Sequence, residues 1–183
     1  MDELFLLPSA PVAMPRAYWM DKFFLSSQLI VIEPSEAEWK RVEYATDHHD
    51  GHDYDMDILN KMYEKSSTVI PHRRYDLLTG ELHNDKHENY LGNQNEKWDA
   101  RKILEEAKFL HFSDWPMPKP WWEPLSGMVE KYQPACRKVS ETEEDCSDRE
   151  VWLYVRKDFS DRREVSHFIG AWLRARYNKP LLT

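Results

Sequence analysis

Two side chains that could act on a phosphorylated ligand stand eight residues apart, at His111 and Lys119. Three prolines lie between His111 and Trp121, and because proline fixes φ and removes a backbone donor, this stretch is predicted to be a loop. An imidazole can bind a metal ion and an ammonium can bind a phosphate, so the pair suits a metal-diphosphate site. One histidine alone does not make a metal site, and the alternative is a backbone-bonded histidine with a surface lysine.

A second candidate is the pair of carboxylates in the stretch Asp55-Met56-Asp57-Ile58-Leu59-Asn60. Apolar residues at helical spacing follow Asp55, so a helix is predicted to begin there. Carboxylates in a first helical turn can simply complement the helix dipole. They can also accept hydrogen bonds from sugar hydroxyls, because an ionised carboxylate is purely an acceptor. Both interpretations stay open at this point.

A third candidate is a polar loop rich in imidazoles and carboxylates, comprising Asp47, His48, His49, Asp50, His52 and Asp53. Such a set could bind a transition metal. Neighbouring residues seldom converge on one ion without help from elsewhere, so a solvated loop is the favoured alternative.

The composition limits the classes of function. At 183 residues the chain can bury the core of one ordinary domain. Its formal charge of −8 argues against nucleic acid and against an anionic membrane surface, because no basic stripe is present. Eight Trp and nine Tyr serve a core, but exposed rings could also contact sugars. The sequence has no membrane-spanning apolar run, no glycine-rich phosphate loop and no hydrolase or metalloprotease motif.

The order of predicted elements indicates an α/β fold. Phe23–Ile32 is apolar and β-branched toward its end, which predicts a buried strand. The capping box Ser35-x-x-Glu38 then predicts a helix start. Thr68–Ile70 and Ala107–Phe112 are predicted strands, and the second delivers His111 at its end. In open α/β sheets, ligands gather at strand ends, where this histidine is expected.

The C-terminal part is predicted to be helical. A second capping box at Ser147-x-x-Glu150 starts one amphipathic stretch, and Glu164–Tyr177 continues the pattern. Cys136 and Cys146 flank an acidic loop, and they could form a disulfide in a secretory lumen or remain thiols in the cytosol. Met1–Leu7 lacks a basic region, so we do not expect it to be a signal peptide.

Three segments, taken in order, resemble the motifs of glycosyltransferase family 8, the glycogenin-like group. Leu25–Gln28 stands where that family has F-N-x-G, ahead of a Pro-Ser pair that begins at Pro34. Asp55–Asn60 stands at the D-Q-(G/D)-x-L-N position, and His111–Trp121 at H-F-x-G-x-x-K-P-W, with two extra residues. The residues in these motifs look most similar to those of the fungal glucose N-acetyltransferase-like members.

The resemblance implies a UDP-sugar donor, Mn²⁺ and retention of anomeric configuration. By carry-over, His111 would bind the metal ion on the diphosphate, and Lys119 would neutralise the departing UDP. Asp55 and Asp57 would be the catalytic side chains that hold the donor sugar or its acceptor. Ser26, at the family's asparagine position, would contact the nucleotide sugar.

The chain also departs from the family pattern. Ser26, Gln28 and Met56 replace the family's Asn, Gly and Gln. The metal-binding D-x-D and the nucleotide-binding strands of the family lie ahead of the segment that this chain resembles. We therefore expect residues 1–135 to form the second half of a glycosyltransferase A-type domain, and residues 136–183 to form a helical extension.

Three hypotheses follow from these observations. The first is a glycosyltransferase that uses a nucleotide sugar and a glycan acceptor, placed in the Golgi lumen by the resemblance, or in the cytoplasm if the start is genuine. The second is a non-catalytic remnant or binding module. Under either hypothesis, the loss of the first half of the domain is expected to leave a sheet edge or apolar face uncovered, so that the isolated chain self-associates. The third is an unrelated metal-binding module built on the His48–His52 loop.

Overall fold

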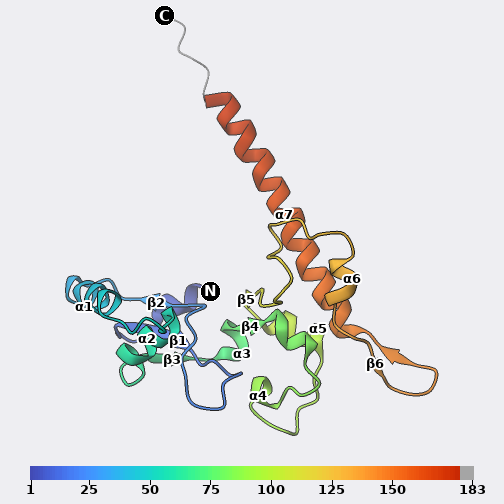
Figure 1. Cartoon of the computed structure of the whole chain (residues 1–183), viewed down its shortest axis with the longest axis horizontal. Coiled ribbons are helices and arrows are strands. Elements are labelled where there is room, and N and C mark those ends of the chain that lie inside the picture. Colours follow the sequence, from blue (N-terminus) through green and yellow to red (C-terminus); the bar gives the residue numbers. More distant parts are fainter. Residues whose placement is uncertain (178–183) are drawn as a thin grey trace, which may run out of the picture. The chain divides into compact units, whose positions relative to one another are not determined.

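The computed structural model describes residues 1–177, and it describes side chains for residues 1–163. The chain forms two compact units, Met1–His111 and Phe112–Thr183, each containing helices and short strands (Figure 1). The predicted α/β class agrees with this mixture. The predicted division after residue 135, which rests on the family resemblance, is a different partition and stays a prediction.

The first unit is built on a three-stranded sheet in the order β2-β1-β3. The central strand β1 (Val12–Pro15) pairs antiparallel with β2 (Val31–Ile32) and parallel with β3 (Thr68–Ile70). All four residues of β1 are buried. A strand buried on both faces needs apolar residues throughout, as this one has.

The two faces of β1 carry separate hydrophobic clusters. Val12 and Met14 pack with Leu25 and Tyr63, whereas Ala13 packs on the other side with a cluster that includes Ile70. This division follows from the alternation of side chains along a strand. The sheet therefore connects the segment around Leu25 to the helix that carries Tyr63.

Two helices follow the central strands and begin at the predicted residues. Helix α1 (Glu36–Asp47) is capped by Ser35, whose hydroxyl accepts a hydrogen bond from the Glu38 amide, as the capping box predicts. Helix α2 (Asp55–Tyr63) also begins where the sequence predicts. Figure 1 shows both helices beside the β2-β1-β3 sheet.

The rest of the first unit consists of short elements and loops. A parallel pair of two-residue strands, β4 (Leu77–Leu78) and β5 (Leu110–His111), sets Leu78 opposite His111. The remaining short helices are η1 (Asp2–Leu6), α3 (His72–Tyr75), η2 (Thr79–His83), α4 (Glu88–Leu91) and α5 (Ala100–Glu106).

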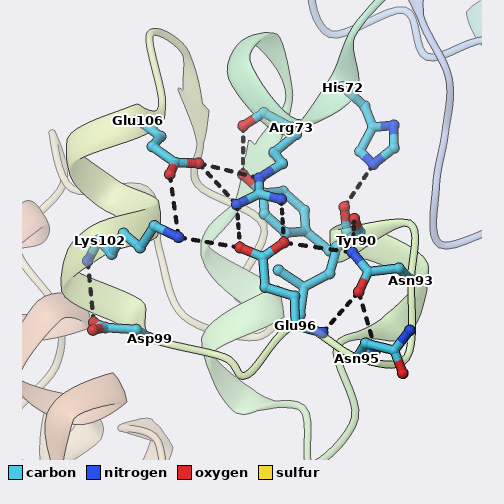
Figure 2. Close-up of polar contacts among 10 residues, drawn as sticks. His72, Arg73, Tyr90, Asn93, Asn95, Glu96, Asp99, Lys102 and Glu106 are labelled. Atoms are coloured by element: carbon cyan, nitrogen blue, oxygen red, sulfur yellow. Dashed lines mark hydrogen bonds and ion pairs between the residues drawn. The ribbon is translucent and has the colours of Figure 1, made fainter.

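An ion-pair network holds the polar segment between α4 and α5 in place (Figure 2). The Arg73 guanidinium donates two hydrogen bonds to the Glu96 carboxylate, both at 2.6 Å, and a third to Glu106 at 3.1 Å. Paired, parallel N–H···O bonds of this kind are among the stronger polar contacts in proteins. They lower the pKa of Glu96 to about 2, chiefly through Arg73. The segment has no regular secondary structure, and this network explains how it is ordered.

The second unit contains the long helix α7 (Ser147–Tyr177), the short helix α6 (Met128–Tyr132) and a hairpin of β6 (Arg137–Lys138) and β7 (Glu144–Asp145). A disulfide joins Cys136 to Cys146 at the base of this hairpin, one of the two states that the sequence left open. Helix α7 begins at Ser147, as predicted; the side-chain pattern predicted for Glu164–Tyr177 lies outside the residues whose side chains are described. Between residues 1 and 177, no helix has the length and hydropathy needed to cross a membrane.

The predicted strand Phe23–Ile32 is wrong over most of its length. Leu25 makes an isolated antiparallel bridge to Arg16, and only Val31 and Ile32 form a regular strand. Between them, the Ser26 amide still donates to the Pro15 carbonyl at 2.8 Å, whereas the Ser27 hydroxyl and the Gln28 amide bond to side chains, Asp55 and Ser26, rather than to a neighbouring strand. The predicted strand Ala107–Phe112 is likewise shortened to Leu110–His111.

Candidate functional site

The loop Leu25–Gln28 is fastened to helix α2 by a buried amide. The Leu25 amide donates to Asn60 Oδ1 at 2.7 Å, and Asn60 Nδ2 donates to the Leu25 carbonyl at 2.8 Å. Asn60 also donates to the Met56 carbonyl within its own helix. A side-chain amide can match both the donor and the acceptor of one residue. Asn60 thereby fixes the loop against the start of α2.

The first carboxylate of α2 faces this loop directly. The Ser27 hydroxyl donates to Asp55 Oδ2 at 2.6 Å. Asp55 is exposed, so its carboxylate can accept further hydrogen bonds from a ligand. The structure thus brings together Asp55 and the loop that the sequence picked out, although the bonded serine is Ser27 rather than Ser26.

The second carboxylate of α2 stabilises its own helix. Asp57 Oδ2 accepts a hydrogen bond from the Tyr54 amide at 3.0 Å, the reciprocal half of a capping box. This contact is a cap, whereas the structural alternative considered for the pair of carboxylates was interaction with the helix dipole. The catalytic role predicted for Asp57 stays a prediction.

Ser26 is fully buried beneath the loop. Its hydroxyl accepts a hydrogen bond from the Gln28 amide at 3.3 Å and lies beside the carboxyl group of Asp76. Because Ser26 has no exposed surface, a direct contact with a nucleotide sugar needs the loop to move. Its predicted role in binding the nucleotide sugar stays a prediction.

Asp76 is the most unusual acidic residue near the loop. Its side chain is fully buried, and neither carboxyl oxygen has a partner of full hydrogen-bond geometry among the described residues. Burial raises the pKa of Asp76 to about 7, and the neighbouring Ser26 hydroxyl lowers it only in part. A buried acid with open hydrogen-bonding capacity is uncommon in folded proteins and points to a role in function.

His111 ends strand β5, as the sequence predicts. Its carbonyl accepts a hydrogen bond from the Thr79 hydroxyl at 3.4 Å, which ties the end of β5 to the residue after β4. Within residues 1–163, the one group of three possible ligands is Cys136, Glu144 and Cys146, and its two cysteines form the disulfide. The described residues therefore offer His111 without the further ligands that a manganese ion needs.

The predicted proline-rich loop belongs to the second unit, and it is fastened to helix α7. Arg156 forms an ion pair with Asp114 at 3.4 Å and donates to the Pro118 carbonyl at 2.8 Å. Lys119 lies in this loop, and its ammonium donates to the carbonyl of Phe112. The Trp115–Pro116 peptide bond is cis. The loop is thus ordered by its contacts as well as by its prolines.

A groove of about 570 Å³ begins next to Lys119 in the second unit. Its lining combines the rings of Trp121 and Trp122 with the charged side chains of Glu123 and Arg163. Trp122 is 67% exposed, which is high for such a large ring. Rings beside charged groups suit a ligand with both hydroxyl groups and apolar faces.

The loop of the third hypothesis does not assemble a metal site. His48 and His49 each direct Nδ1 to a backbone carbonyl of α1, at 2.8 and 2.6 Å. Lys61 pairs with Asp53 at 2.5 Å and with Asp50 at 3.2 Å, and the first contact chiefly lowers the pKa of Asp53. No group of three ligands forms here among the described side chains.

Three residues that organise these features were given no role from the sequence: Asn60, which ends the stretch Asp55–Asn60, Asp76 and Arg156. Asn60 could have been noticed as a polar residue on the buried face of α2. Asp76 stands directly before the apolar pair Leu77-Leu78, which is an unusual place for an acid. Arg156 lies between the apolar residues of α7 without a sequence signal for its partner.

No family model and no solved structure matches the chain. Among curated proteins, the chain is 46% identical over 176 residues to Glucose N-acetyltransferase 1 of Gibberella zeae, covering 93% of this chain and 38% of that protein. It is 45% identical over 179 residues to the protein of the same name from Aspergillus fumigatus, covering 90% of this chain and 47% of that protein. The Saccharomyces cerevisiae protein of that name is 29% identical over 184 residues, covering 79% of this chain and 36% of that protein.

These relatives are longer than the chain, which spans less than half of each of the three. The identity of 46% extends over nearly the whole chain, so all the features described above fall within or close to the shared region. The chain is thus related, over most of its length, to part of the fungal proteins named Glucose N-acetyltransferase 1.

Proposed function

We propose that the chain is part of a retaining glycosyltransferase that transfers a hexosyl or N-acetylglucosaminyl group from a UDP-sugar to a glycan. The observation that carries this proposal is the 46% identity to a protein named Glucose N-acetyltransferase 1. The motif resemblance to glycosyltransferase family 8 supports a glycosyltransferase A-type domain, of which this chain would be the second half.

The geometry of the first unit supports a binding role for Asp55. Its exposed carboxylate is held at the start of α2 by Ser27, so its position is set before a ligand arrives. A carboxylate fixed in this way can accept hydrogen bonds from two sugar hydroxyls without losing further side-chain entropy. Asp55 would orient the donor sugar or its acceptor.

The second unit would contribute the positive charge of Lys119, which could bind a phosphate group. Lys119 carries an ammonium group on an ordered loop, and an ammonium is a compact donor for a phosphate. Its present contact is to a carbonyl, which a phosphate oxygen can replace as the acceptor. Lys119 would then stabilise the negative charge that develops on the departing UDP.

We propose Mn²⁺ as the metal and His111 as one of its ligands. Imidazole and carboxylate oxygen are ligands that bind manganese, but the described residues place no carboxylate pair around His111. The described residues thus do not supply a complete manganese site. We also propose the Golgi lumen as the compartment, which is supported by the disulfide.

A second candidate is a non-catalytic binding module. It is favoured by one observation among the described residues, the open groove lined by the rings of Trp121 and Trp122. This candidate would bind a ligand in that groove without transferring sugar.

A transfer assay separates the two candidates. The longest protein that the gene encodes would be incubated with Mn²⁺, a glycan acceptor and UDP-N-acetylglucosamine, UDP-glucose or UDP-galactose. We expect sugar incorporation from one donor, and a loss of at least about 100-fold in rate for His111→Ala. His49→Ala is the matched control, because His49 is an exposed histidine that bonds only locally among the described residues. Full activity in His111→Ala would remove that residue from the metal site.

A further inference from the structure

Asp76 stands where two parts of the proposed site meet within the first unit. It directly precedes β4, and β4 pairs with β5, which ends at His111. On its other side, its carboxyl lies beside Ser26, in the loop that bonds to Asp55 through Ser27. The buried side chain of Asp76 thus lies next to the Leu25–Gln28 loop, and Asp76 directly precedes strand β4.

The stability of the fold does not explain an acid at this position. A buried carboxyl without full hydrogen bonds costs free energy, and no described lysine or arginine pairs with Asp76 to offset that cost. The titratable groups around it are the phenols of Tyr18 and Tyr90, both buried and neutral. An apolar residue would be less costly here, so a side chain with oxygen acceptors at this position calls for another explanation.

Ser26 connects the carboxyl group of Asp76 to the Leu25–Gln28 loop. The Ser26 hydroxyl has one hydrogen to donate and lone pairs to accept with. It accepts from the Gln28 amide at 3.3 Å, which leaves its hydrogen available for the neighbouring carboxyl of Asp76. The Ser26 hydroxyl thus lies between the Asp76 carboxyl and the Gln28 amide, while the Ser26 amide is held separately by the Pro15 carbonyl at 2.8 Å.

We propose that Asp76 is a positioning residue that holds the Leu25–Gln28 loop against the β4–β5 strand pair, so that Asp55 and His111 face the same nucleotide sugar. This inference rests on the proposed function, and it assigns Asp76 a role that is distinct from binding the ligand itself.

The first test measures the loop without any ligand. Hydrogen exchange of the Gln28 amide would be followed by NMR in the 183-residue chain and its variants. Asp76→Ala is expected to speed exchange at Gln28 about tenfold, because the acceptor of that amide loses its own anchor. Asp76→Asn should keep most of the protection, because its amide oxygen can still accept from Ser26.

The control is Asp99→Ala, which removes the cap of helix α5 and leaves the loop contacts intact. It should destabilise the chain without changing exchange at Gln28 beyond the global effect. If Asp76→Ala fails to fold, Ser26→Ala removes the same contact from the other side and must speed exchange in the same way. Unchanged exchange at Gln28 in the folded variant overturns the proposal.

The second test measures binding of the UDP-sugar by the longest protein that the gene encodes. Asp76→Ala should weaken binding about tenfold, the range found when a residue that orients a ligand-binding group is removed. Asp76→Asn should recover most of the affinity, whereas equal losses in Asp76→Ala and Asp99→Ala would overturn the positioning role. If the wild-type protein binds no UDP-sugar, the proposed function fails, and the exchange experiment alone decides whether Asp76 holds the loop.

Discussion

At the scale of single residues, the side chains that were expected to touch a ligand divide into two groups. Asp55 is exposed and its carboxylate is held by Ser27, so it can bind a ligand without rearranging. Ser26 instead accepts a hydrogen bond from the Gln28 amide beneath the loop, and Asp57 accepts one from the Tyr54 amide at the start of α2. Residue type alone does not distinguish these cases, because a serine or aspartate can serve a cap, a turn or a ligand equally well.

The buried acid Asp76 gives a prediction about pH and stability. Its folded-state pKa is raised to about 7, above the value of about 3.9 expected in the unfolded chain. The folded state therefore binds the proton more tightly, and its contribution to stability is full below about pH 4 and is lost as the pH rises toward about 7. Three units of pKa correspond to a loss of up to about 4 kcal/mol.

Urea unfolding at pH 5 and at pH 8 would measure this effect. The free energy of unfolding of the wild-type chain should fall between these pH values by more than that of Asp76→Asn, which has no proton to lose. Asp99→Asn, at an exposed helix cap, is the matched control and should follow the wild type. Equal slopes for the wild type and Asp76→Asn would show that Asp76 does not titrate in this range.

At the scale of elements, the sequence predicts the places of helices better than the extent of strands. The starts of α1, α2 and α7 agree with the predictions, because caps and apolar spacing are local signals. The strand predicted at Phe23–Ile32 is mostly absent. The conformation of this segment depends on contacts with Asn60 and Asp76, which are far away in the sequence. No pattern in the local sequence predicts contacts with residues so far along the chain.

The same reasoning applies to the candidate site. His111 was placed correctly at a strand end, because an apolar run before it signals a strand. The loop around Lys119 was predicted from its prolines, but its anchor Arg156 lies on another element. The residues that position a site come from distant elements, so a single sequence shows the chemical groups more readily than their supports.

The anchor of the proline-rich loop can be tested by removing Arg156. Arg156 and Asp114 are both largely buried, with side-chain exposures of 10% and 3%. Breaking a buried ion pair leaves one charge uncompensated, so Arg156→Ala should lower the free energy of unfolding by about 3 kcal/mol. Arg162→Ala is the control, because its pair with Asp158 is exposed and should cost under about 1 kcal/mol. Similar small losses for both variants would refute the anchoring role.

At the scale of the whole molecule, the chain corresponds to part of longer relatives, and its surface has open apolar features. Strand β2 lies at the edge of its sheet, and Ile32 on that strand is 61% exposed. Trp39, on the next helix, is 62% exposed and lines the same groove as Ile32. Open sheet edges with apolar side chains favour association between chains.

We therefore expect the isolated chain to self-associate in a concentration-dependent way. Light scattering during size-exclusion chromatography should show species larger than a monomer, and Ile32→Lys should shift the population toward the monomer, because a charge on an edge strand opposes pairing. Val139→Lys is the matched control, since Val139 is similarly exposed at 64% but lies in the second unit. A monomeric wild-type chain at every concentration would contradict this expectation.

The most direct test is calorimetric titration of UDP into the longest protein that the gene encodes, with and without Mn²⁺. The proposal under test is that this chain contributes His111 to a metal-dependent nucleotide-sugar site. We predict UDP binding that is stronger with Mn²⁺ and that is lost in His111→Ala but kept in His49→Ala. An absence of UDP binding with Mn²⁺ present, or binding that His111→Ala leaves unchanged, would contradict the claim for this chain.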